Sequence, residues 1–225
     1  SSQVAYVNDL KSKITTSLTS YATSSDLNRF GGRFKYSKVL NVIDNIDKSI
    51  TSNITRVKIR RNLNALINQF AQYELCFGNR FNVKPEGLNI KSTGFRIQGQ
   101  SDTVFITDTP NADKLTGVIS IVKRDETTGT NIVVVKSAGT VDYVHGEVNL
   151  TTINIVSTDK PNNIVEVQAF PDSNDVIGLQ DLYLEFNIPN STINMVKDTI
   201  TSGEQISGVG YKVTSSYANG DLTRT

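Results

Sequence analysis

The chain has 225 residues, with 23 Lys and Arg against 22 Asp and Glu, one His, one Cys and no Trp. A formal net charge of +1 argues against a dedicated nucleic-acid binder, and one Cys with one His can build neither an internal disulfide nor a structural zinc site. No run approaches the roughly 18 apolar residues that a membrane span needs. The first residue is Ser rather than Met, so we expect a processed product or a fragment of a longer protein.

The first 50 residues predict two helices. Apolar residues spaced by three or four mark one stripe of a first helix, which ends at the cap-forming run 23–26; they are Val7, Leu10, Ile14, Leu18 and Tyr21. Gly31 and Gly32 then allow a sharp bend. Ser37 is expected to cap a second, short helix that ends near Asp47.

From Ile50 the pattern changes to a period of two, which is typical of a strand. Thr55, Val57 and Ile59 alternate with Arg56, Lys58 and Arg60, so we expect one strand with a buried and a solvated face. Residues 63–77 fit either a helix or a strand. We prefer a strand at least for 70–77, because that run alternates and ends at a Gly-Asn turn signal.

Beyond residue 80, short β-branched runs alternate with turn residues. The runs are 104–106, 118–122, 132–135, 147–150, 153–156, 164–169 and 182–186, and the tail from Met195 to Tyr217 also favours strand. The runs 118–122 and 132–135 predict a hairpin. We therefore expect an α+β fold, with a helix-helix-strand-strand unit at 1–80 and a mainly antiparallel β-rich domain at 81–225, a sandwich, barrel or meander that includes the C-terminal strand segment.

No catalytic, metal or cofactor site is predicted. His145 lies in what looks like the bend of a hairpin, and Cys76 alternates with apolar neighbours as a half-buried hydrophobe would. The paired carboxylates could in principle bind a cation or act on a glycosidic bond, but capping and solvation account for them better; they are Asp44 with Asp47, Asp125 with Glu126, and Asp181 with Glu185. We expect no enzymatic activity.

Two candidate interaction surfaces remain. The basic stripe of Arg56, Lys58 and Arg60 could meet an acidic protein partner, although an ordinary solvated face is the simpler interpretation. The glycine-spaced tail could join a sheet edge between subunits, and an internal strand is the alternative. Its candidate interface residues are Ile206, Val209, Tyr211, Val213 and Tyr217.

One stretch carries a resemblance to a known family. Residues 25–37, 39–44, 50–57 and 73–79 resemble the C-terminal part of the baseplate J-like wedge proteins of contractile-tailed phages, those of T-even-type phages in particular. In that family a helix, a glycine-marked bend, a second helix and a strand follow in this order. The likeness is good over about residues 1–80 and looser to residue 225.

The resemblance implies a structural fragment of the virion tail baseplate, assembled in the host cytoplasm, without enzymatic activity or cofactor. Copies would associate, with a dimer as the basic unit, and would join other wedge proteins in a ring that rearranges on tail contraction. Neither nucleic acid nor a membrane span is implied. The alternative is a receptor- or carbohydrate-binding β-module of a tail fibre or adhesin, whose aromatic platform would have to come from the scattered Tyr143, Tyr183, Tyr211 and Tyr217.

Overall fold

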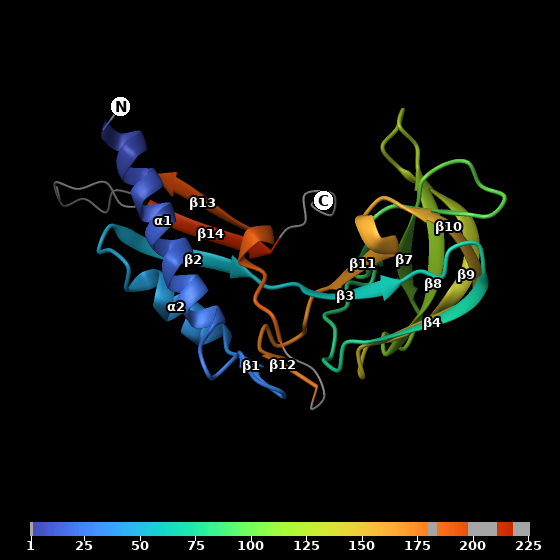
Figure 1. Ribbon diagram of the computed structural model, residues 1–225, viewed down its shortest axis with the longest axis horizontal. Helices are drawn as coiled ribbons and strands as arrows, with labels where there is room; N and C mark the ends of the chain where they lie inside the picture. Colours follow the sequence, from blue (N-terminus) through green and yellow to red (C-terminus); the bar gives the residue numbers. More distant parts are fainter. Residues whose placement is uncertain (1, 180–183, 198–210, 218–225) are drawn as a thin grey trace. The chain divides into compact units, whose positions relative to one another are not determined.

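The structure, a computed structural model, describes residues 2–179, 184–197 and 211–217. These residues form two compact units (Figure 1). The first unit contains the chain up to Val57 and the described residues from Asn174 onward, and the second contains Lys58–Ser173. The chain crosses from one unit to the other twice, so the second unit is an insertion in the first. The sequence instead predicts a domain boundary near residue 80. That boundary stays a prediction.

Helix α1 (Ser2–Ala22) opens the first unit. The predicted stripe is confirmed for Leu10, Ile14, Leu18 and Tyr21, which are all buried, whereas Val7 is half-buried. On the solvated side, the hydroxyls of Thr15 and its neighbours donate hydrogen bonds to carbonyls one turn back along the helix. The helix therefore satisfies its polar face locally and buries the opposite one.

A bend and a two-residue strand, β1 (Arg33–Phe34), lead to helix α2 (Tyr36–Asp44). Gly31 has a φ of 64°, which a residue with a side chain adopts only under strain. The predicted cap at Ser37 is wrong, since Ser37 already lies inside α2 and Lys35 occupies the N-cap position without a side-chain bond. Instead the carboxylate of Asp175 accepts the N–H of Tyr36 at 2.8 Å.

A three-stranded sheet completes the first unit. Its order is β13 (Ser191–Lys197), β14 (Tyr211–Tyr217) and β2 (Ile50–Arg56), with β14 antiparallel to β13 and parallel to β2. Helix α1 contacts β13 and α2 contacts β2, so both helices lie against this sheet (Figure 1). β12 (Val176–Ile177) pairs with β1, and a short 3-10 turn at Ile188–Asn190 precedes β13.

The second unit is built from antiparallel strands. They are β3 (Ile59–Asn64), β4 (Phe70–Cys76), β5 (Lys91–Ser92), β6 (Phe95–Ile97), β7 (Val104–Pro110), β8 (Thr116–Arg124), β9 (Asn131–Asp142), β10 (Glu147–Thr158) and β11 (Ile164–Ala169), with a 3-10 turn at Pro161–Asn163. Because β10 pairs with both β6 and β9, the strands β10-β6-β7-β8-β9 close into a ring, here called the barrel. β4 adds to β10, and β3-β11-β5 form a separate small sheet.

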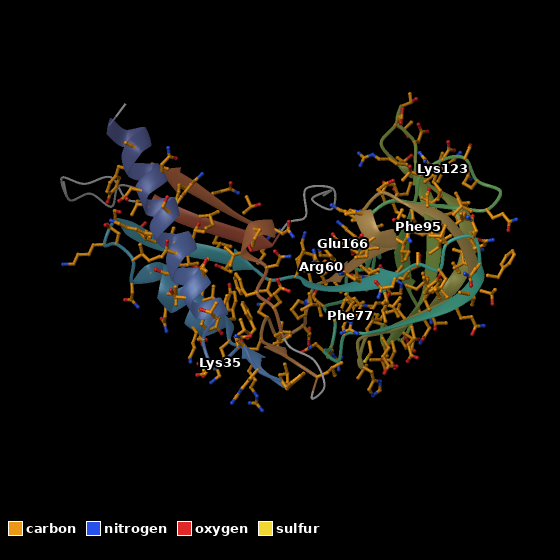
Figure 2. The ribbon with its side chains drawn as sticks, viewed as in Figure 1. Lys35, Arg60, Phe77, Phe95, Lys123 and Glu166 are labelled. Atoms are coloured by element: carbon orange, nitrogen blue, oxygen red, sulfur yellow. The ribbon has the colours of Figure 1, made fainter. Side chains whose placement is uncertain are left out.

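One apolar core fills this unit, from Leu63 to Ala169. Phe77 and Phe81 meet edge to face at 5.1 Å between ring centroids, and Phe95 and Tyr143 are almost completely buried. Phe77 and Phe95 are labelled in Figure 2. The core draws on nearly every strand of the unit, which explains why so many short runs cooperate in one fold.

The expected fold class is confirmed, since two helices are followed by a mainly antiparallel strand-rich region. The strand at 70–77, the 118–122/132–135 hairpin and the bend around His145 are also confirmed. Three details differ. The predicted strand through Arg56 and Arg60 is two strands in different sheets, and the runs 147–150 and 153–156 are one strand, β10.

The third difference concerns the run 182–186. Leu184–Phe186 is not a strand, and residues 182 and 183 lie outside the described part. Phe186 instead stacks on Phe34 at 5.3 Å and meets Tyr21 edge to face at 6.5 Å. An aromatic contact, rather than a sheet, thus accounts for the apolar residue that suggested a strand.

Candidate functional site

His145 and Asp142 form a surface turn. The Nδ1 of His145 lies 2.8 Å from Asp142 Oδ2, and the other carboxylate oxygen accepts the backbone N–H groups of Val144 and His145, each at 2.9 Å. These amide bonds, that of His145 first, lower the pKa of Asp142, and the bond to Asp142 raises the pKa of His145. The Asp142–His145 pair therefore stabilises a turn. The His145 side chain is 70% exposed, as is typical of a surface turn rather than of a catalytic centre.

Two further acids, Asp47 and Asp125, also stabilise turns. Asp47 accepts the N–H of Ser49 and Asp125 accepts that of Thr127, each at 2.8 Å, and these bonds lower the pKa of both carboxyls. Cys76 is half-buried on β4, as expected. Among the described residues, no group of three or more His, Cys, Asp and Glu could hold a metal ion; Asp181 lies outside them.

The structure does not place the basic stripe on one strand. Arg56 ends β2 in the first unit, Lys58 lies in the connection, and Arg60 is on β3 in the second unit. Arg60 donates to Glu166 of β11 at 3.1 Å (Figure 2), and the Lys58 ammonium lies 5.3 Å from the Phe170 ring centroid. The alternation of basic and apolar residues predicted a single strand, but the backbone leaves the strand conformation between Arg56 and Ile59. A contact with an acidic partner stays a prediction.

The candidate interface of the tail falls partly outside the described residues. Ile206 and Val209 lie there, whereas Tyr211, Val213 and Tyr217 lie on β14. β14 is the middle strand of its sheet, with ladder partners on both sides. Its backbone is therefore not available as a sheet edge over these residues, which favours the internal-strand alternative. The strand pairing of β14 does not test whether the five candidate residues take part in an interface between subunits, so that role stays a prediction.

The second unit contains a buried polar cluster that the sequence did not reveal. Asp108 is 2% exposed and accepts hydrogen bonds from the Tyr143 hydroxyl at 2.5 Å, Asn89 Nδ2 at 2.9 Å and the Ile90 N–H at 2.7 Å. Burial and the bond to Asp108 raise the pKa of Tyr143, so its phenol stays protonated. The one sign of this cluster in the sequence is that Asp108 lies within the β-branched run of β7. Tyr143 is thereby removed from any surface aromatic platform.

Tyr36 links the two chain segments that lead to the inserted unit. Its N–H donates to Asp175, just after the insertion, and its hydroxyl donates to the carbonyl of Thr55, just before it, both at 2.8 Å. On the second unit, Ile59 pairs with Ala169 where the chain enters and leaves. Each unit therefore holds its own entry and exit segments together.

One strand edge of the barrel is exposed and apolar. Over residues 131–135, β9 pairs with β8, and its pairing with β10 starts only at Gly139. Ile132 is 42% exposed and Val133 57% exposed. Four consecutive β-branched residues, 132–135, thus occupy an edge that has no further strand beside it in the described part of the chain.

An open groove runs between α1 and α2. Its lining includes Lys13, Lys38, Val42 and Ile46. Lys13 pairs with Asp9 at 3.0 Å, and Lys38 pairs with Asp26. The groove therefore offers no concentrated charge that would select a cofactor. Of the described helices, none has the length and apolar character needed to cross a membrane.

Residues 3–62 match the family model described as baseplate structural protein gp6, C-terminal domain III. The match supports a phage baseplate protein. This baseplate segment, residues 3–62, runs from α1 through β1, α2 and β2 into β3, which is the helix, bend, helix and strand order derived from the residues. The matched family is that of a structural baseplate protein, which is consistent with a non-enzyme. No curated protein matches the chain.

Proposed function

We propose that the chain is a structural component of a baseplate wedge in a contractile-tailed phage, of the baseplate J-like type. Copies associate with one another, with a dimer as the basic unit, and with other wedge proteins into a ring that rearranges on tail contraction. The protein is assembled in the host cytoplasm and resides in the tail baseplate of the virion.

The match of the baseplate segment carries this proposal. It coincides with a folded part of the chain, α1 through β2, whose element order agrees with the J-like resemblance. Composition supports the same function. With 21 Ser, 24 Thr and 22 Asn, the surface can meet neighbouring subunits through neutral hydrogen-bonding groups with little charge to desolvate.

Three finer assignments form part of the proposal. Residues 1–80 are the J-like domain and 81–225 the β-rich domain. The Arg56, Lys58 and Arg60 region meets an acidic wedge partner. The C-terminal residues Ile206, Val209, Tyr211, Val213 and Tyr217 take part in contacts between subunits.

Loss of the protein tests the main proposal. A phage whose gene for this chain is interrupted is expected to form heads but no complete baseplates, as seen by negative-stain electron microscopy, and supply of the chain from a plasmid should restore them. Normal contractile tails without the chain would overturn the proposal.

A charge reversal tests the acidic-partner surface. Arg56→Glu is expected to weaken capture of the wedge partner by about tenfold in a pull-down titration, because a like charge then faces the acidic surface. Arg33→Glu, an exposed arginine on β1 of the same unit, is the matched control and should bind normally. Equal binding by both variants would remove Arg56 from the interface.

A further inference from the structure

We propose that the exposed edge of β9, residues 131–136, pairs antiparallel with the same edge of a second copy of this chain. The inference rests on the self-association in the proposed function and names its surface. A strand edge presents unpaired backbone N–H and C=O groups, and natural proteins usually block such edges with charge or proline. Residues 131–135 carry neither.

The edge is self-complementary in shape. In an antiparallel pair centred on Val133, Val133 lies opposite Val133 of the copy and Ile132 lies opposite Val134. Each position therefore meets a β-branched residue of similar size, the kind of cross-strand pair that stabilises sheets. The exposed areas of Ile132 and Val133 would leave water on pairing.

Charge complementarity favours the second copy over an unrelated strand. Lys136 is the single charge of the edge segment and would lie opposite the uncharged Thr130 in the β8–β9 loop of the copy, which also carries Asp125 and Glu126. Asp125 stays ionised because backbone N–H groups lower its pKa. Arg124, the like charge nearby, lies on β8 opposite Asn131 of β9, so Asn131 lies between it and Lys136 of the copy.

The geometry also limits the strength of this contact. The register between β8 and β9 shifts near Val133 and Val135, and such bulges bend an edge and shorten the segment that can pair. We therefore expect weak, reversible association in solution. Most copies would be paired through β9 when neighbouring subunits hold them together at an effective concentration of about 1 mM.

Sedimentation equilibrium of the 225-residue chain from about 10 µM to about 1 mM tests the proposal. Wild type is expected to dimerise reversibly, and Val133→Lys to weaken dimerisation by about tenfold or more, because the two lysines face each other across the axis. Phe70→Lys is the matched control, since Phe70 is 69% exposed on β4 and lies outside the proposed contact. Unchanged thermal unfolding of both variants checks the fold.

A second variant tests the register. In a Cys76→Ser background, Val133→Cys should form an intermolecular disulfide on oxidation, whereas Phe70→Cys should not. A wild type that stays monomeric throughout, or a Val133→Lys variant that dimerises like wild type, would overturn the proposal. Protection of the β9 amides only on addition of another wedge protein would assign the edge to that partner instead. None of these results depends on baseplate formation, so failure here leaves the proposed function to its own test.

Discussion

Asp108 is expected to contribute strongly to the stability of the second unit, because three donors converge on its buried carboxylate. Asp108→Ala should lower the free energy of unfolding by at least about 3 kcal/mol, since the Tyr143 hydroxyl and the Ile90 N–H lose their partner without gaining water. Urea denaturation followed by circular dichroism measures the change.

Asp102→Ala is the control for this substitution. Asp102 pairs with Lys123 at 2.8 Å on the surface and should cost less than about 1 kcal/mol. Equal losses in the two variants would contradict a special role for the buried cluster.

His145 permits a clean pH experiment because it is the only histidine in the chain. The Asp142 bond, with help from the charge of Glu147, raises its pKa in the folded state. The stabilisation is therefore fully present below the ordinary histidine pKa of about 6.5 and is lost as the pH rises through the higher folded value. Asp142, whose pKa is lowered, stays ionised throughout this range.

We expect the difference in Tm between wild type and His145→Gln to be larger at about pH 5.5 than at about pH 8.5. An NMR titration of the single imidazole should give a pKa above about 6.5. A pKa at or below that value would show that the Asp142 contact does not persist in solution.

At the scale of elements, the segments around the insertion depend on Tyr36. Asp175→Ala removes the acceptor at the start of α2 and should cost about 1 kcal/mol, as loss of a helix cap does. Tyr36→Phe should release the carbonyl of Thr55. Hydrogen exchange should accelerate at 55–57 and 173–176 while β7 and β8 keep their protection. Uniform acceleration across both units would contradict this local role.

The β9–β10 hairpin depends on a close approach at Gly139. A Cβ at this position would overlap the backbone carbonyl of Asn149 on β10. Gly139→Ala should therefore destabilise the second unit by about 1–3 kcal/mol in thermal or urea unfolding. The neighbouring exposed Ser137→Ala should change stability by less than about 0.5 kcal/mol. A neutral Gly139→Ala would mean that the strands separate there without cost.

Elements with local causes could be predicted from the sequence, and those with distant causes could not. The spacing of Leu10, Ile14 and Leu18 identifies α1 because a helix buries residues three or four apart. By contrast, the strand through Arg56 and Arg60 divides because β2 pairs with β14 and β3 with β11, both more than 100 residues further along the chain. The cap of α2 comes from Asp175 for the same kind of reason.

The candidate sites likewise could be predicted only where their cause lies in neighbouring residues of the sequence. The turn role of His145 and the half-buried Cys76 were predictable from their neighbours. The Asp108 cluster was not, since Asn89 and Tyr143 approach it from separate segments. The exposed β9 edge was also missed, because the run 132–135 looks the same whether a strand lies beside it or not.

At the scale of the whole molecule, the second unit should fold alone. Its core is drawn entirely from residues 59–169, and its first and last strands, β3 and β11, pair along their full length. A protein of residues 58–173 is expected to unfold cooperatively and to give amide resonances that overlay those of the same residues in the full chain. A non-cooperative transition or a collapsed spectrum would contradict this modularity.

The two ends of the inserted unit lie side by side, and this affects the order in which the two units fold during synthesis. All strands of the second unit have been made by Ala169, whereas β2 must wait for β14, which begins at Tyr211. If the second unit folds as soon as it emerges, the pairing of β3 with β11 joins its ends and shortens the effective loop between β2 and β14. The entropy cost of closing a loop grows with its length. A pairing across more than 150 residues of chain then becomes almost a local step.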